Sequence, residues 1–469
     1  MSLPSPGYAI TIRAEAPATT TATGELARAV SSAGAVLTAL DIVESQPDRI
    51  LVDLTCNAVD ASHVETIKKA IAALDGVAVH KVSDRTFLIH LGGKLSVESK
   101  VPLRHRDDLS QAYTPGVARV CQAIAAEPRD VRRLTIKHNT VAVVTDGSAV
   151  LGLGNIGAAA SIPVMEGKAA LFKRFGGIDA WPVCLDTQDS DEIVRIVQAM
   201  APVYGGINLE DIAAPRCFEI ERRLRSLLDI PVFHDDQHGT AIVVFAALTN
   251  ALRVVEKRLD DVRIVIAGAG AAGTAIARLL LAEGASNIIN FDHRGALNRN
   301  RQDLGPDRQW LATHTNQACF SGSLREALVG ADVFIGVSAG GLLSGEDIGR
   351  MASGAIVFAL ANPDPEVDPT EARRHAAVVA TGRSDEPNQI NNVLVFPGVF
   401  RGLLDSGAER ISMSVETAAA RALASIVSDH ELNPSYIIPS VFNPTVVSAV
   451  AEAVSNAVAT DHDQTGEDI

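Results

Sequence analysis

The feature that most constrains the fold of this sequence is a glycine pattern between an apolar strand and a helix. The β-branched run Val262–Ala267 is followed by Gly268-Ala-Gly270-Ala-Ala-Gly273 and then by a helical stretch at 274–283. In this context the first glycine permits a tight turn, the second the close approach of a pyrophosphate, and the third close packing of the helix. Free N–H groups at the helix start can bind the phosphates. The pattern predicts a Rossmann-type dinucleotide-binding domain.

An acidic residue, Asp292, closes the next predicted strand, roughly twenty residues after the last glycine, where an acid can accept a hydrogen bond from a ribose 2′-hydroxyl. This position favours NAD as the cofactor. The adjacent His293 and Arg294 could instead contact a 2′-phosphate, so NADP stays open as an alternative.

A second series of apolar runs alternates with helical stretches between residues 135 and 236. Strands joined by single helices form parallel sheets, whose carboxyl ends lie at one edge. Two consecutive runs end in acidic pairs, Glu210-Asp211 and Asp235-Asp236. We therefore expect these four carboxylates to lie within reach of one ion.

Clustered carboxylates without cysteine favour a hard cation such as Mg²⁺ or Mn²⁺. The alternative is that these acids are helix N-caps, since Asp is common before a helix. We favour the metal because four acids crowded on one edge would repel one another without a cation.

The chain in front of these motifs has its own pattern. Strand and helix signals follow in the order β-α-β-β-α-β, which is typical of a ferredoxin-like α+β fold, and a polar, turn-rich linker comes next. The fold class is therefore α/β, with two α/β domains preceded by the small α+β domain. The expected boundaries are 1–95 for the front domain, 100–237 for a substrate and metal domain, 238–440 for the dinucleotide domain with a last strand at 393–396, and 441–469 for a C-terminal helix and acidic tail.

Composition excludes several classes of partner. A formal net charge of -15 argues against a nucleic-acid or anionic membrane surface, because both require clustered Lys and Arg. The sequence has no apolar run long enough to cross a bilayer and no secretory signal at its start. The cysteines are odd in number and lack CxxC spacing, which favours reduced thiols. We expect a cytoplasmic protein with small-molecule partners.

Two further residues indicate chemistry only in context. Lys168 lies at a predicted helix start after a glycine-rich stretch, 151–157. A partly desolvated lysine near a metal can have its pKa lowered enough to act as a base. Tyr113, before a turn, indicates nothing by itself.

As an ordered set, the motifs between residues 105 and 440 resemble those of malic enzymes. They read YTPGVA, VVTDGSAVLGLGNIG, PVMEGKAALF, NLEDI, FHDDQHGTA, GAGAAG, ANPDPE and QINNVLVFPGVFRG. The front segment resembles an ACT domain, a module that often binds small effectors.

The resemblance implies an enzyme that oxidises malate with NAD or NADP and a divalent metal, decarboxylates the product to pyruvate, and is a homo-oligomer. It implies that Tyr113 is the catalytic acid and Lys168 the catalytic base. The other implied roles are metal ligation by Glu210, Asp211 and Asp236, support near the lysine by Asp235, and binding of malate and the nicotinamide end by Asn362 and Asn392.

One stretch departs from the family pattern. Many eukaryotic members carry an arginine that grips the malate carboxylate where this chain reads Asp146-Gly147-Ser148-Ala149-Val150. The carboxylate must then be held by loop amides or by a group from a second subunit. Two other functions remain as alternatives. One is a metal-dependent 2-hydroxy-acid dehydrogenase that does not decarboxylate, and the other is an inactive effector-sensing protein.

Overall fold

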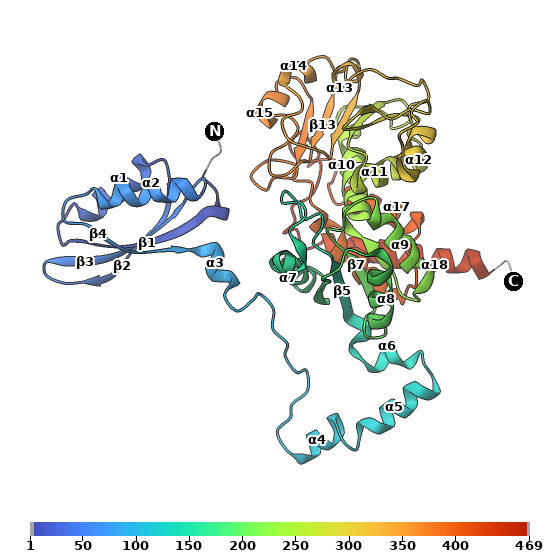
Figure 1. Cartoon of the computed structure of the whole chain (residues 1–469), viewed down its shortest axis with the longest axis horizontal. Coiled ribbons are helices and arrows are strands. Elements are labelled where there is room, and N and C mark those ends of the chain that lie inside the picture. Colours follow the sequence, from blue (N-terminus) through green and yellow to red (C-terminus); the bar gives the residue numbers. More distant parts are fainter. Residues whose placement is uncertain (1–3, 467–469) are drawn as a thin grey trace. The chain divides into compact units, whose positions relative to one another are not determined.

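The computed structural model describes residues 4–466 of the chain, with side chains to residue 461. The chain divides into two compact units, Met1–Ser96 and Val97–Ile469 (Figure 1). Each unit has a core of its own.

The first unit is a four-stranded antiparallel sheet in the order β2-β3-β1-β4. Alternate side chains of the central strands, such as Ile12 and Leu54, are buried beneath two helices. This is the predicted ferredoxin-like order. Its elements are β1 (Ala9–Pro17), α1 (Ala22–Ser32), β2 (Val36–Ser45), β3 (Arg49–Asn57), α2 (Ala61–Ala72) and β4 (Ala78–Asp84), with a short η1 (Pro6–Tyr8) in front and α3 (Arg85–His90) behind.

The second unit contains a parallel sheet in the order β6-β5-β7-β8. Because all its strands point the same way, their carboxyl ends share one edge, as the sequence predicted. The strands are β5 (Thr140–Thr145), β6 (Asp179–Cys184), β7 (Gly206–Leu209) and β8 (Val232–His234). The helices are α7 (Gly157–Gly176), α8 (Ser190–Met200), α9 (Arg216–Leu227) and α10 (Thr240–Val254), with the short helices η2 (Ile136–Asn139), η3 (Ala201–Val203) and η4 (Asp235–Gly239).

The other sheet of this unit has the order β11-β10-β9-β12-β13-β14, and all its pairs are parallel except β10 with β11. This confirms the Rossmann-type prediction. The strands are β9 (Arg263–Ala267), β10 (Asn287–Asp292), β11 (Gly295–Ala296), β12 (Val333–Gly336), β13 (Ile356–Ala359) and β14 (Val378–Thr381). The helices are α11 (Ala271–Ala282), α12 (Pro306–His314), α13 (Leu324–Ala327), α14 (Gly345–Ile348) and α15 (Pro369–Ala372).

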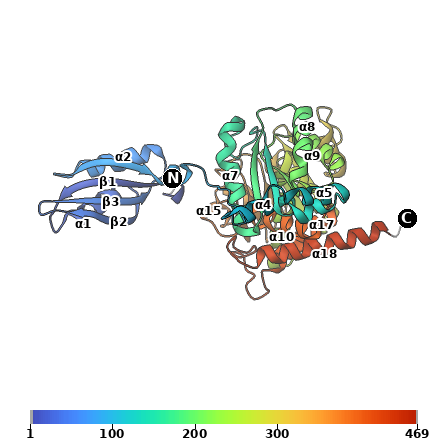
Figure 2. The same cartoon turned by 90° about the horizontal axis from the view of Figure 1, so that it is seen from below.

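The strand predicted at 393–396 is wrong. The chain forms a short 3₁₀ helix, η5 (Asn392–Leu394), and then α16 (Phe396–Ser406). A short apolar run has no periodicity that separates a buried strand from a helix start, and Pro397 suits the first helical turn. Phe396 packs against Phe172 of α7, with ring centroids 4.6 Å apart. The C-terminal helices α17 (Met413–Ser425) and α18 (Val446–Gly466) pack together, as Figure 2 shows.

Residues 97–134 form a segment that we call the arm. It carries α4 (Arg106–Ala112), α5 (Val117–Ala126) and α6 (Asp130–Leu134). Within these three helices, all of whose residues the structure describes, none is buried. Apolar side chains such as Leu109 and Val120 are therefore exposed. Across residues 4–466, none of the helices is long and apolar enough to span a bilayer.

Candidate active site

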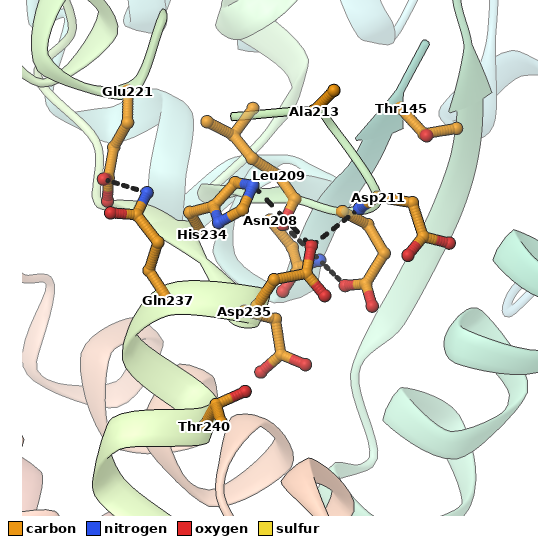
Figure 3. Close-up of polar contacts among 12 residues, drawn as sticks. Thr145, Asn208, Leu209, Asp211, Ala213, Glu221, His234, Asp235, Gln237 and Thr240 are labelled. Carbon is orange, nitrogen blue, oxygen red and sulfur yellow. Dashed lines mark hydrogen bonds and ion pairs between the residues drawn. The ribbon is translucent and has the colours of Figure 1, made fainter. Parts of the chain in front are cut away.

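The carboxylates of Glu210, Asp211 and Asp236 meet at the carboxyl edge of the β5–β8 sheet. One oxygen of each lies within 4.8 Å of the others. The backbone N–H of Asp211 donates to Asp236 Oδ2 at 2.8 Å (Figure 3). Asp211 adopts φ 54, in the left-handed region that few non-glycine residues enter and that Asp tolerates better than most. The structure thus brings together the acids that the sequence singled out as metal ligands.

The electrostatics of this cluster fit a divalent cation. Burial, reinforced by the charge of Asp236, raises the pKa of Asp211 to about 8. Burial also holds the pKa of Glu210 well above its usual range. A cation among these oxygens would stabilise the charged carboxylates, and an all-oxygen donor set suits a hard ion such as Mg²⁺ or Mn²⁺.

The helix-cap alternative finds no support at this edge. Asp235 and Asp236 are the first residues of η4, which continues directly into α10, and α9 begins after Pro215. Among the described residues, no side chain caps η4, α9 or α10. The acids instead face one another.

Lys168, on α7, lies against the same cluster. Its Nζ donates to Asp235 Oδ2 at 2.5 Å and to Glu210 Oε1 at 3.1 Å, and it sits 3.9 Å from the centre of the Phe396 ring. Its side chain is buried. Burial lowers the pKa of Lys168, but the charges of Asp235 and Glu210 outweigh it and the net shift is upward. The predicted lowering of this pKa is therefore wrong for the structure, because the lysine lies between two carboxylates and not only in an apolar setting.

Of the two predicted asparagines, Asn392 lies beside this cluster and Asn362 lies at the end of a strand of the second sheet. Asn392 donates through Nδ2 to Asp235 Oδ2 at 3.0 Å, so it orients the carboxylate that touches Lys168. Asn362 follows β13, and its Nδ2 donates to the carbonyl of Leu360 at 3.3 Å. The loop at Gly152 comes close to Asn362, since a Cβ on that glycine would lie 3.6 Å from the Asn362 carbonyl oxygen. The glycine-rich loop and the β13 end are thus neighbours.

Tyr113 stands apart from these residues. It follows α4 on the arm and is 68% exposed, whereas Lys168 is 8% exposed. The chain taken alone does not bring the predicted acid to the buried lysine.

The glycine turn after β9 has the geometry that its pattern predicted. Gly268 adopts φ 131, and a Cβ on Gly273 would lie 2.0 Å from the Gly268 carbonyl oxygen, so both positions require glycine. A Cβ on Gly270 would meet no described atom within 4 Å. No side chain caps the first turn of α11 among the described residues. Open space and free N–H groups are what a pyrophosphate needs.

Asp292 ends β10 as expected, but its carboxylate is already engaged. Arg301 donates to both of its oxygens, at 2.8 and 3.0 Å, and Arg308 approaches at 3.4 Å. The Asp292 side chain is 2% exposed. Contact with a ribose hydroxyl at this position stays a prediction.

Sequence reasoning missed a buried ionic triad beside the acidic cluster. His238 contacts Glu221 Oε1 through Nε2 at 2.7 Å and Glu416 Oε1 through Nδ1 at 2.9 Å. Burial lowers the pKa of His238, but the two carboxylates outweigh it and raise that pKa to about 10. The triad joins α9, α17 and η4, the turn that carries Asp235 and Asp236. No local signal predicts it, because Glu416 is remote in sequence.

We expect Glu416→Gln to weaken this anchor. The charge-assisted bond to His238 is worth about 1.5–3 kcal/mol, so the melting temperature should fall by several degrees. If the triad positions Asp236, the activation constant for Mn²⁺ should also rise roughly threefold or more. Glu452→Gln, an exposed change on α18, is the control. A lower melting temperature with unchanged Mn²⁺ activation would limit the triad to stability.

Together, the glycine turn and the acid and lysine cluster define a dinucleotide-binding α/β protein with a buried acidic site. Two family descriptions match it, "Malic enzyme, N-terminal domain" over residues 92–225 and "Malic enzyme, NAD binding domain" over residues 237–460. The chain belongs to the malic enzyme family, which confirms the resemblance seen in its motifs.

Similar proteins agree with this placement. An NAD-dependent malic enzyme of Geobacillus stearothermophilus is 54% identical over 448 residues, covering 96% of this chain and 94% of that protein. A bifunctional malic/malolactic enzyme of Bacillus subtilis is 51% identical over 82% of this chain and 92% of its own length. The crystal structure of an NAD-dependent malic enzyme from Thermotoga maritima is 47% identical, with a TM-score of 0.77 over 80% of this chain and 99% of that one. Other relatives are named NADP-dependent malic enzymes.

Proposed function

We propose that this chain catalyses the oxidative decarboxylation of malate to pyruvate and CO₂, with reduction of NAD or NADP, at the cluster around Lys168. The observation that carries the proposal is the buried ammonium of Lys168 between Asp235 and Glu210. Glu210 is also one of the three carboxylates whose oxygens lie within 4.8 Å of one another. The glycine turn after β9 lies in the same compact unit and supplies a site for a dinucleotide.

Glu210, Asp211 and Asp236 would hold Mg²⁺ or Mn²⁺. A bound divalent cation supplies Lewis-acid stabilisation of the negative charge that develops on the substrate oxygens. It would also neutralise Glu210, one of the two carboxylates that raise the pKa of Lys168. The chain's own part is to hold the acids at fixed positions through the β7 and β8 ends.

Lys168 is the base in this scheme. After the ammonium has passed a proton to Asp235, the neutral Nζ can take the proton of the malate C2 hydroxyl, and a bound nicotinamide would accept the hydride from C2. Asp235 is its partner for proton exchange, since Oδ2 lies 2.5 Å from Nζ, and Asn392 holds that oxygen in place. The C3–C4 bond of the keto acid then breaks, CO₂ leaves, and the electron pair stays on C3. Tyr113 donates the proton that C3 receives, and Asn362 binds the malate and nicotinamide end.

Tyr113 can act as the acid only if the arm docks beside a Lys168 cluster. We propose that the arm of one chain docks on a second copy, so that the enzyme is a homo-oligomer with shared sites. The arm exposes Leu109 and Val120. The β5–β8 sheet and its helices expose Trp181, on the edge strand β6, and Val164, on α7. Each apolar set gains by burial against the other.

The front unit is proposed to be an ACT-like regulatory domain that binds a small effector, on the strength of its ferredoxin-like strand order. We also propose a cytoplasmic location. This suits the free thiols of the cysteines within residues 4–466, which are Cys56, Cys121, Cys184, Cys217 and Cys319.

The decisive test is a malate assay with NAD and with NADP, each with Mn²⁺ and with EDTA. We expect one pyruvate per reduced cofactor with Mn²⁺ and almost no turnover with EDTA. Oxaloacetate in place of pyruvate would indicate a dehydrogenase without decarboxylation. No turnover under any condition, with dinucleotide still bound, would favour an inactive sensor.

A further inference from the structure

The carboxyl end of β10, where a Rossmann fold meets the adenosine ribose, carries an ionic network. Arg301 binds Asp292 through two nitrogens and also donates to Asp303 Oδ2 at 2.8 Å. Arg294 donates to the same Asp303 oxygen at 2.9 Å, and Arg308 approaches Asp292 at 3.4 Å. Three guanidinium groups therefore surround two carboxylates, which leaves one excess positive charge.

The side chains of this network differ in how far they are exposed to solvent. The Asp292 side chain is 2% exposed and that of Arg301 is 16% exposed, whereas those of Arg294 and Arg308 are 60% and 40% exposed. A cofactor arriving at this strand end meets the two exposed guanidinium groups before the carboxylate. The two carboxylate oxygens of Asp292 already accept three bonds from guanidinium groups and one from the backbone N–H of Arg294.

This arrangement changes how Asp292 acts on cofactor choice. A free aspartate at this position selects NAD in two ways, by accepting a hydrogen bond from the 2′-hydroxyl and by repelling a 2′-phosphate. A bidentate arginine partner cancels the repulsion and occupies the acceptor oxygens. The remaining exposed guanidinium groups attract a phosphate.

We propose that Arg301 sets the cofactor specificity of this chain by sequestering Asp292, and that the site accepts NADP as well as NAD, with Arg294 and Arg308 as the groups that meet the 2′-phosphate. This rests on the proposed function only in placing a dinucleotide at the glycine turn. It replaces the simple interpretation that Asp292 makes the chain an NAD enzyme.

The test compares NADP with NAD through the ratio of their kcat/KM values. Arg301→Gln releases Asp292, so the NADP to NAD ratio should fall about tenfold or more. Asp292→Asn alone should change the ratio less than about threefold, because Arg301 keeps its two bonds to the Asp303 carboxylate. Adding Asp292→Asn to Arg301→Gln should restore most of the NADP activity, which a general loss of structure would not do.

The outer arginines have their own expected effect. Arg294→Gln and Arg308→Gln should each raise the KM for NADP several-fold and change the KM for NAD less than about twofold. Arg299→Gln is the control, because Arg299 lies in the same loop but bonds the amide of Gln317. It should leave the ratio unchanged.

Two results would overturn the proposal. One is an Asp292→Asn protein whose NADP to NAD ratio rises tenfold or more, since that identifies Asp292 as a free selecting acid. The other is an Arg301→Gln protein with an unchanged ratio. Fluorescence titrations with NADPH and with NADH, without malate, compare the dissociation constants of the two cofactors independently of catalysis. A failure of decarboxylation would leave those titrations intact, so the two proposals fail separately.

Discussion

Replacing Lys168 by alanine is expected to lower kcat for malate-dependent cofactor reduction by roughly a thousandfold, the usual scale for loss of a positioned base. Asp235 and Glu210 each lie one hydrogen bond beyond the position of Nζ, so neither carboxylate occupies the place of the lost amine. The measurement is the initial rate of NADH formation at saturating malate, NAD and Mn²⁺.

The control separates chemistry from folding. Lys168→Ala leaves two buried carboxylates without their cation, which destabilises the site and lowers the melting temperature. Lys173→Ala removes a lysine from the same helix, but one that is exposed and paired with Asp179 at 2.6 Å. It should keep full activity. A folded Lys168→Ala protein that still binds NADH and retains a tenth of the normal rate would exclude Lys168 as the base.

Tyr113→Phe is expected to slow pyruvate formation about a hundredfold while malate oxidation continues at a reduced rate. The change removes one hydroxyl from an exposed residue, so stability should hold. Rapid quenching and separate measurement of NADH, oxaloacetate and pyruvate test this, with oxaloacetate accumulating in the variant. Equal pyruvate formation by variant and parent would remove Tyr113 from its role.

A mixing experiment then identifies the chain to which Tyr113 belongs. Neither Tyr113→Phe nor Lys168→Ala chains have a complete site of their own. If the arm reaches a second copy, a mixed dimer has one site with both native residues. Random mixing of equal amounts of a dimer should then recover about a quarter of the parental activity. Co-expression with two affinity tags provides the mixed species, and its lack of activity would place Tyr113 and Lys168 of one site in the same chain.

Local patterns were enough for the parts of this protein that depend on near neighbours along the chain. The glycine turn at Gly268 was predictable because its backbone angles and its helix packing arise within a few residues. The meeting of Glu210 and Asp236 was predictable because strands joined by single helices must run parallel, so consecutive strand ends share an edge. The strand order of the front unit followed in the same way.

Interactions between segments that are far apart in the sequence could not be predicted from it. The upward pKa shift of Lys168 comes from Asp235 and Glu210, which lie far from it in the sequence. A side chain's charge state depends on the groups packed around it in space, and the residues next to Lys168 in the sequence do not reveal them. The same holds for His238, whose partners lie on two other helices. Arg301 is close to Asp292 in the sequence, but their pairing depends on the fold of the loop between them. The amino-acid order thus specified which chemical groups this protein carries and at which strand ends, while their charges and free lone pairs were set by contacts that exist only in the folded chain.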